Sequence, residues 1–388
     1  RMIRNGLCLL VFLFFVSCSA QNESNRLQVG AERMDQYLPL LEGKAVALVV
    51  NQTSLVGSTH LVDTLLARGI AIKKVMAPEH GFRGEAPDGE TIDDSRDAQT
   101  GLPIISIYGS SKKPSAEMLE DVDVLIFDIQ DVGVRFYTFI STMHYVMEAA
   151  AENGKTVIVL DRPNPNGMYI DGPVKEEDVN SFVAMHPIPV VHGLTVGELA
   201  QMINGEAWLA NGVTADLTVI PLKSWDHTQS YSLPVRPSPN LPNDNAIALY
   251  PSLGLFEGTV VSVGRGTDHP FEQIGHPLYS SGGTSFTPQP NAGSKYPPLE
   301  GELCVGYAFY EAESPRGFTL KWLIDFYQDL SPKTEFFKDY LTLLAGTDQL
   351  RKQIEAGLSE QDIKRLWQPK LNAYKAMRKQ YLLYPDFE

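Results

Sequence analysis

The first half of the chain alternates short apolar runs with segments whose apolar residues recur at helical spacing. The runs are rich in Val, Ile and Leu, which is typical of parallel strands buried on both faces. Two intervening segments, 59–68 and 137–152, have the spacing of amphipathic helices and end close to a glycine. This βαβα layout predicts an α/β fold with a Rossmann-like, doubly wound, mainly parallel sheet. The predicted strands are 45–50, 72–77, 104–108, 122–128 and 156–161.

The second half of the chain has a different pattern. Four prolines punctuate the segment VRPSPNLPNDNA, and because proline restricts the residue before it, this segment is expected to be a rigid extended loop. A short apolar run at 260–263 predicts one strand, and the C-terminal third is mainly helical. The predicted helices are 320–327, 336–344, 350–356, 361–367 and 371–381. These elements indicate a second domain of α+β type.

The N-terminal segment predicts export. Arg1 and Arg4 precede an uninterrupted apolar run at 7–16, which is about half of the ~20 residues that a membrane-spanning helix needs. The order Phe15-Val16-Ser17-Cys18 resembles a lipoprotein cleavage box, so we expect 1–17 to be a signal peptide and 18–37 a tether that begins at a lipidated Cys18. Ordinary cleavage near Ala20 is the alternative. The expected location is a membrane of the cell envelope, on the periplasmic side of the outer membrane if the host is Gram-negative.

Charge and cysteine content exclude several classes of partner. The chain has 47 acidic and 32 basic residues and a net charge of −15, which argues against nucleic acid as a partner. Of three cysteines, Cys8 and Cys18 lie in the N-terminal segment and Cys304 in an apolar context, so neither disulfides nor a thiolate metal site is expected. The first predicted strand is followed by NQTSLVG and not by a Gly-x-Gly-x-x-Gly motif, so no dinucleotide or phosphate cofactor is expected. No obligate protein partner is evident.

Polar residues follow four of the predicted strands. The carboxyl ends of parallel strands share one edge of a sheet, where open α/β folds bind ligands, so these residues predict a single site. The densest group follows the second strand in the sequence PEHGFRGE. The candidates are Asn51 and Gln52 after the first strand, Glu79, His80, Arg83 and Glu85 after the second, Asp128, Gln130, Asp131 and Arg135 after the fourth, and Asp161, Arg162 and Asn164 after the fifth.

These motifs resemble a bacterial family once known only as a domain of unknown function, whose characterised members are exo-β-N-acetylmuramidases. The resemblance runs over roughly residues 38–388, and its strongest parts are NQTSLV, PEHGFRGEAPDGE, FDIQDVGVRFYT, LDRPNPNG, RPSPNLP, LFEGT and SVGRGTDHPFEQIG. It implies a Rossmann-like N-terminal domain at 38–245 and a smaller C-terminal domain at 246–388, with the active cleft at their interface. It also implies release of N-acetylmuramic acid from the non-reducing end of peptidoglycan fragments.

Glycosidic cleavage needs an acid that protonates the leaving oxygen and a carboxylate on the other side of the bond. Glu79 is the predicted acid, because it follows a buried strand and a partly desolvated carboxyl group stays protonated near neutral pH. His80 is expected to orient it. Asp131 or Glu85 is expected to act as the second carboxylate, with Asp128 as a rival. Retaining, inverting and substrate-assisted mechanisms all remain open.

Muramic acid differs from glucosamine by a lactyl carboxylate, for which a bidentate arginine is the best-suited partner. Arg265 lies between two glycines, which suits a guanidinium placed in a cleft. Other side chains could bond sugar hydroxyls or the acetamide, or stack on a sugar face. The candidate arginines are Arg83, Arg135, Arg162 and Arg265, and the other substrate-binding candidates are Asn51, Asp128, Gln130, Tyr137, Asn164, Asn240, Glu257 and Phe271.

Two other classes of protein are consistent with the sequence. A metal-dependent hydrolase could use some of the histidines, although the chain has no His-Glu-x-x-His or His-x-His spacing. These histidines are His60, His80, His144, His192, His269 and His276. A non-catalytic glycan-binding lipoprotein would use the same crevice without turnover. The several carboxylates at strand ends favour the enzyme.

Overall fold

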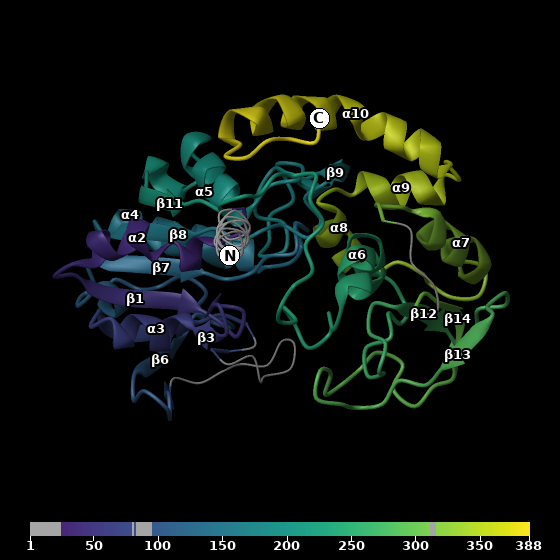
Figure 1. Ribbon diagram of the computed structural model, residues 1–388. Coiled ribbons are helices and arrows are strands. Elements are labelled where there is room, and N and C mark those ends of the chain that lie inside the picture. Colours follow the sequence, from purple (N-terminus) through teal and green to yellow (C-terminus); the bar gives the residue numbers. More distant parts are fainter. Residues whose placement is uncertain (1–24, 80, 83–94, 311–315) are drawn as a thin grey trace, which may run out of the picture.

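The computed structural model describes residues 25–79, 81–82, 95–310 and 316–388 (Figure 1). Within this part of the chain, the N-terminal half contains a seven-stranded sheet in the order β11-β8-β7-β1-β4-β6-β5. All neighbouring strands are parallel except the short edge strand β5, which pairs antiparallel with β6. The strands are β1 (Ala45–Val50), β4 (Ala71–Ala77), β5 (Ser95–Arg96), β6 (Pro103–Ser106), β7 (Val124–Asp128), β8 (Thr156–Leu160) and β11 (Asp216–Ile220). This confirms the predicted doubly wound α/β fold.

The two faces of the sheet bury different residues of the same strands, because successive side chains of a strand point to opposite faces. In β1, Ala47 and Val49 belong to one apolar cluster, whereas Val46, Leu48 and Val50 belong to the other. The helices α4 (Phe139–Glu152) and α5 (Val196–Gly205) cover the first face, and α3 (Leu61–Ala67) covers the second. This half also contains two short antiparallel strand pairs, β2 (Leu55–Val56) with β3 (Thr59–His60) and β9 (Asp171–Val174) with β10 (Pro189–Val191). Its 3-10 turns include η3 (Glu117–Leu119) and η4 (Ala210–Gly212).

The folded part of the N-terminal half begins earlier than the sequence indicates. The residues before 38, which we expected to be a tether, include η1 (Gly30–Glu32) and α2 (Met34–Tyr37), and η2 (Leu38–Leu41) follows. Tyr37 is completely buried and donates a hydrogen bond to the Ala31 carbonyl. The Gly30 amide donates to the Asp161 carbonyl at 2.8 Å. Residues 30–37 therefore pack onto the sheet and are not part of a tether.

The C-terminal half is smaller and of α+β type, as predicted (Figure 1). Its antiparallel sheet has the order β12-β14-β13, which the sequence analysis missed. Its elements are α6 (Asp244–Leu253), η5 (Gly254–Gly258), β12 (Gln273–His276), β13 (Thr284–Phe286), β14 (Cys304–Ala308), α7 (Lys321–Leu330), α8 (Tyr340–Ala345), α9 (Gln349–Glu355), α10 (Glu360–Arg378) and η6 (Lys379–Tyr381). None of the helices in the described ranges combines the length and apolar character that crossing a bilayer requires.

Two sequence predictions for this half are wrong. Residues 260–263 do not form a strand, because the neighbouring segments offer only single bridges, Thr259 with Phe337 and Ser262 with Gly275. The two helices predicted at 361–367 and 371–381 are one helix, α10, which continues through Pro369. Its buried residues recur at helical spacing, so packing of one face outweighs the backbone hydrogen bond that proline removes.

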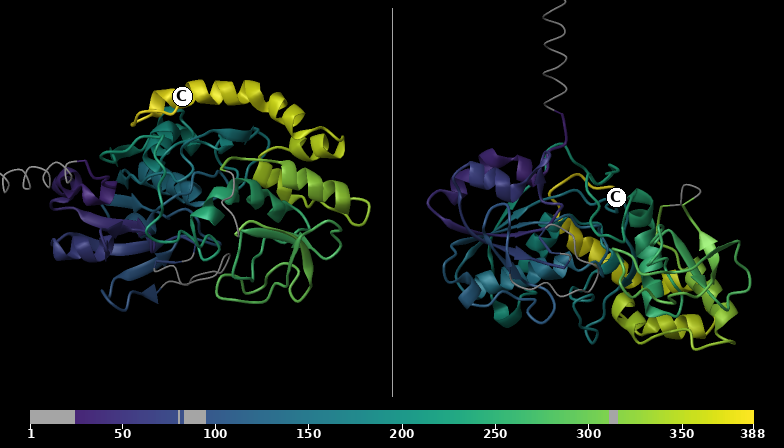
Figure 2. Two further views of the ribbon diagram at one scale, coloured as in Figure 1. Left: turned by 45° about the vertical axis from the view of Figure 1, so that its right-hand side comes forward. Right: turned by 90° about the horizontal axis from the view of Figure 1, so that it is seen from below.

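The helix α10 connects the two halves, because it runs from the C-terminal domain back over the N-terminal one (Figure 2). Arg378, at its end, is completely buried and donates from Nε and Nη2 to the Gly193 carbonyl at 3.0 and 2.8 Å. Further along the tail, the Tyr384 hydroxyl donates to the Asp161 carboxylate and accepts from the Leu222 amide. Burial raises the pKa of Asp161 to about 7. The C-terminal tail is therefore anchored beside the end of β8.

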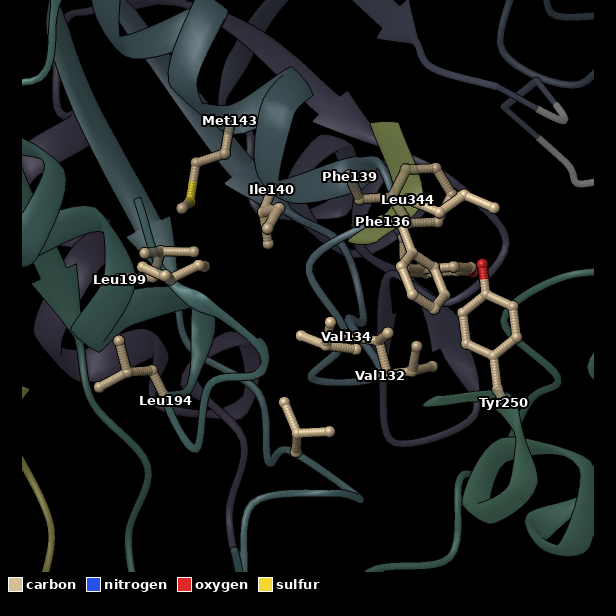
Figure 3. Packing of buried hydrophobic residues seen from close by; sticks show 14 of the residues in the cluster. Val132, Val134, Phe136, Phe139, Ile140, Met143, Leu194, Leu199, Tyr250 and Leu344 are labelled. Atoms are coloured by element: carbon tan, nitrogen blue, oxygen red, sulfur yellow. The ribbon is translucent and has the colours of Figure 1, made fainter. Parts of the chain in front are cut away.

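One apolar cluster extends through both halves. It contains Phe127 and Met143 from the N-terminal domain and Leu253 and Phe326 from the C-terminal domain. At the boundary, the rings of Phe136 and Tyr250 meet edge to face with their centroids 5.3 Å apart, and Figure 3 shows the two rings next to each other. The two domains therefore share a continuous core.

Replacing Gly30 with alanine is expected to lower the free energy of unfolding by about 1–3 kcal/mol, because the site is already filled. A Cβ atom at this position would lie 2.5 Å from the Asp161 nitrogen and 2.6 Å from the Ile220 oxygen, and both are backbone atoms that cannot move aside easily. Chemical denaturation measures the difference. Gly283→Ala is the matched control, because a Cβ atom there meets no atom of the described chain within 4 Å. Equal stability of the two variants would contradict the packing argument.

Candidate active site

A pocket of about 280 Å³ lies between the two domains. Residues of the N-terminal domain form one wall, at the carboxyl end of the sheet. Residues of the C-terminal domain and of the proline-rich loop form the other. The lining residues are Glu79, Tyr108, Lys112, Phe136, Tyr137, Thr138, Phe139, Phe182, Val183, Ser238, Asn240, Leu241, Tyr250, Glu257, Arg265, Phe271 and Tyr340.

Glu79 lies on the N-terminal wall, two residues after β4 ends at Ala77. Its carboxylate is half-buried and accepts hydrogen bonds from two hydroxyl groups. Tyr108, which follows β6, donates to Oε1 at 2.9 Å, and Thr138, which precedes α4, donates to Oε2 at 3.4 Å. Because both donors come from neighbouring sheet connections, the fold itself fixes the direction in which this carboxyl group points.

Arg265 and Glu257 lie together on the C-terminal wall. Arg265 Nε donates to Glu257 Oε1 at 2.7 Å, and the guanidinium carbon is 5.1 Å from the centroid of the Phe271 ring. Gly264 and Gly266 flank Arg265 with φ values of 80° and 77°, which glycine adopts without strain. The same turn places Phe271 at a φ of 57°, an uncommon conformation for a bulky residue. Strain of this kind is concentrated at functional sites.

Tyr340, the first residue of α8, links the two walls electrostatically. Burial raises the pKa of Tyr340 to about 12, and the carboxylates of Glu257 and Glu79 act in the same direction. The carboxylates of both walls therefore influence the same Tyr340 hydroxyl group, and Glu79, Glu257 and Tyr340 all line the pocket. Arg265 opposes this effect on the Tyr340 pKa.

The proline-rich loop is held against the N-terminal domain by side chains near the pocket. Tyr137 donates from its hydroxyl group to the Pro237 carbonyl at 2.9 Å, and Gln52 Nε2 donates to the same carbonyl at 3.1 Å. Asn240 donates from Nδ2 to the Gly293 carbonyl at 2.8 Å. Tyr137 and Asn240 both line the pocket, as does Phe271.

Asp128 and Arg162 lie outside the pocket lining, in a buried ion pair. Arg162 Nε is 2.6 Å from Asp128 Oδ1, and Arg162 Nη2 is 2.9 Å from Oδ2, so the pairing is bidentate. Arg162 Nη2 also donates to the Leu55 carbonyl at 2.9 Å. These two candidates therefore connect the ends of β7 and β8 to the loop after β1.

Asn51 and Gln130 form hydrogen bonds within and between the loops at this edge of the sheet. Asn51 is completely buried, and its Oδ1 accepts from the amide and the hydroxyl group of Thr53. Gln130 donates from Nε2 to the Asp131 and Pro163 carbonyls at 2.8 and 2.6 Å. Neither side chain lines the pocket.

The structure places three further candidates in structural contacts away from the pocket lining. Asp131 Oδ2 accepts from the Gly133 amide at 2.8 Å and lies 3.7 Å from His192 Nε2. Asn164 donates to the Leu194 carbonyl at 2.9 Å. Arg135 is completely buried, and burial lowers its pKa to about 9.

Four predicted residues lie outside the described residues, namely Cys18, His80, Arg83 and Glu85. In the ranges that are described, no three His, Cys, Asp or Glu side chains are placed to hold a metal ion. Two of the histidines, His144 and His186, contact each other, with Nδ1 of the first 3.0 Å from Nε2 of the second.

Profiles of the exo-β-N-acetylmuramidase NamZ family match the chain over both domains, the N-terminal profile at residues 46–245 and the C-terminal profile at 248–384. The chain belongs to this family. It is 39% identical to the peptidoglycan β-N-acetylmuramidase NamZ of Bacillus subtilis (strain 168), over 97% of each chain. The resemblance in the sequence is thus confirmed.

Two solved structures of DUF1343 family proteins from Bacteroides fragilis NCTC 9343 have the same architecture as this chain. One is 45% identical with a TM-score of 0.86, and the other is 29% identical with a TM-score of 0.79. Each covers 93% of this chain and is itself covered over 99% of its length. This chain and both DUF1343 family proteins thus share the two-domain arrangement.

Sequence reasoning missed several lining residues of this NamZ-family pocket. Tyr108 is the last residue of the third predicted strand, and β6 in fact ends at Ser106, so the strand-end argument could have found it. Thr138 lies in the motif that supplied Tyr137 and could also have been found. Tyr250 and Tyr340 give no signal in the sequence, because their positions depend on how the second domain docks.

Replacing Asp128 with asparagine is expected to lower the free energy of unfolding by about 3–5 kcal/mol, because Arg162 would keep a buried charge without a carboxylate partner. Denaturant titration measures this loss. Glu355→Gln is the matched control, since it removes the exposed ion pair with Arg351 and is expected to cost less than about 1 kcal/mol. A loss below about 1 kcal/mol in the Asp128 variant would show that this ion pair does not hold the sheet edge together.

Proposed function

We propose that the protein is an exo-acting glycoside hydrolase that releases N-acetylmuramic acid from the non-reducing end of peptidoglycan fragments. Membership in the NamZ family and the 39% identity to a peptidoglycan β-N-acetylmuramidase support this substrate class. The size of the pocket supports action on a terminal sugar. At about 280 Å³ it is close to the lower limit of ligand pockets, which span ~300–1,000 Å³, and suits one sugar ring better than a stretch of polymer.

The position of Glu79 is the observation that carries the proposal. A general acid must point its carboxyl group at the leaving oxygen, and two hydroxyl groups fix the direction of this one. Protonated Glu79 gives its proton to the glycosidic oxygen as the C1–O bond breaks and positive charge develops at C1. Glu79 thereby becomes a carboxylate, to which Tyr108 continues to donate. Water then forms the new bond to C1, and the proton that it releases restores the acid form of Glu79. Asp131 does not line the pocket, so we assign no step to it.

Aromatic side chains support the binding of a sugar face. Tyr137, Tyr250 and Phe271 all line the pocket, and they meet one another edge to face at centroid distances of 6.0 and 5.0 Å. A cluster held in this way offers apolar surface to the C–H face of a pyranose at little entropic cost, because none of the rings has to be ordered on binding.

Replacing Glu79 with glutamine is expected to lower kcat for an aryl β-N-acetylmuraminide by about 10²–10⁴-fold, because the amide cannot donate a proton to the leaving oxygen. Binding of N-acetylmuramic acid, measured by calorimetry, should change little. Glu120→Gln is the control, since Glu120 is exposed and does not line the pocket. If Glu79→Gln keeps more than about a tenth of kcat, Glu79 is not the acid. Binding without turnover by the wild type would indicate a glycan-binding protein.

We also propose that the protein is exported and attached to an envelope membrane through lipid on Cys18. The basic residues, the apolar run and the sequence FVSC at the start of the chain support this. Expression of the full chain in a bacterial host with labelled fatty acid should label the wild type and not a Cys18→Ser variant. Label in both proteins, or in neither, would contradict lipidation at this residue.

A further inference from the structure

We infer that Arg265 binds the lactyl carboxylate of muramic acid and that Glu257 and Phe271 hold Arg265 in place for this task. This inference rests on the proposed function, since it names the group by which the site distinguishes muramic acid from glucosamine. Four arginines were candidates from the sequence. The contacts of the described side chains separate them.

Two of these arginines are committed to the scaffold. Arg162 forms its bidentate pair with Asp128, and Arg135 donates to three backbone carbonyls, those of Pro173, Ile188 and Leu344. Neither lines the pocket, and Arg83 lies outside the described residues. Among the described arginines, Arg265 is the one that lines the pocket.

Glu257 and Phe271 both contact the guanidinium of Arg265. Glu257 accepts from Nε at 2.7 Å, and the ring of Phe271 lies beneath the group at 5.1 Å. A guanidinium carries five N–H donors in one plane, so it can bond Glu257 and receive a second carboxylate in the same plane. Because the group is already positioned, little side-chain entropy is lost when the ligand binds.

The backbone around Arg265 is built to keep this position. Cβ atoms on the flanking glycines would clash, at Gly264 with the His269 carbonyl at 2.7 Å and at Gly266 with the Gln289 carbonyl at 2.6 Å. The strained Phe271 is held by its amide, which donates to the Val263 carbonyl at 2.7 Å, and by its edge-to-face contact with Tyr250. The turn therefore fixes both the arginine and the ring under it.

The charges of the pocket match a substrate with one negative charge. Apart from the acid Glu79, the charged side chains of the described lining are Glu257, Arg265 and Lys112, which together carry one net positive charge. A lactyl carboxylate neutralises it, whereas the matching glucosaminide leaves it unpaired. Glu79 and Arg265 lie on different walls, and the C1 and C3 substituents of a pyranose also leave the ring in different directions. A single sugar between the domains can therefore meet both.

The first test needs no variant. Calorimetry with the wild type compares N-acetylmuramic acid, its lactyl methylamide and N-acetylglucosamine. The methylamide keeps the shape of the lactyl group and removes its charge. A charge-assisted hydrogen bond contributes about 1.5–3 kcal/mol, so N-acetylmuramic acid should bind about 10- to 150-fold more tightly than the methylamide. Equal affinities for the charged and the neutral ligand would overturn the inference.

The second test assigns the effect to residues. Arg265→Met should lose the 10- to 150-fold preference while binding the methylamide as the wild type does. Glu257→Gln and Phe271→Leu should each lose part of the preference for the charged ligand. Phe271→Tyr, which keeps an aromatic ring, should retain this preference. Arg68→Lys, an exposed arginine outside the pocket lining, is the control. A variant that loses affinity for both ligands equally would point to a structural role and contradict the assignment.

Failure of this inference is distinguishable from failure of the proposed function. Wild-type hydrolysis of the aryl muraminide together with an unchanged preference in Arg265→Met would overturn the role of Arg265 and leave the hydrolase intact. Charge-dependent binding through Arg265 without hydrolysis would support the role of Arg265 and overturn the hydrolase. If Arg265→Met does not fold, Arg265→Lys replaces it in the same binding comparison, because lysine keeps the positive charge but lacks the planar guanidinium group.

Discussion

The buried ion pair between Asp128 and Arg162 determines where a ligand can bind to this sheet. The six parallel strands reverse their order between β1 and β7, and open α/β folds leave their ligand crevice at such a point. Here Arg162 pairs with Asp128 at the end of β7 and donates to Leu55 after β1, so the crevice is filled by the protein itself. The pocket lies farther along the same edge, at the carboxyl ends of β4 and β6. There the second domain supplies the facing wall.

A pocket with its walls on two domains depends on how firmly these domains are joined. Arg135 provides a direct link, because it donates to Pro173 and Ile188 in the first domain and to Leu344 in α8. The same helix begins at Tyr340, which lines the pocket. The continuous apolar core acts in the same direction, since opening the interface would expose the contact between Phe136 and Tyr250 to water. The distance between Glu79 and Arg265 is thus set by the core.

Sequence reasoning succeeded where a local pattern determines the structure. The apolar runs identified five of the parallel strands, but β11 was missed because Asp216 and Thr218 interrupt its apolar run. The strand-end argument placed Glu79 and Asp128 at one edge of the sheet. It could not separate them, because the contacts that pair Asp128 with Arg162 and leave Glu79 in the pocket lining are not visible in the sequence. Glu257 and Arg265 came from motifs, and their place opposite Glu79 results from domain docking, which no local pattern encodes.

The anchored tail has a mechanical consequence for the entry of substrate. The chain leaves the first domain where it enters α6 and returns to it where Arg378 and Tyr384 dock after α10, so both ends of the C-terminal domain are attached to the first domain. Together with the shared core, this closed path of the chain limits how far the two walls of the pocket can separate. Substrate is therefore expected to enter a pocket that is largely formed before it binds.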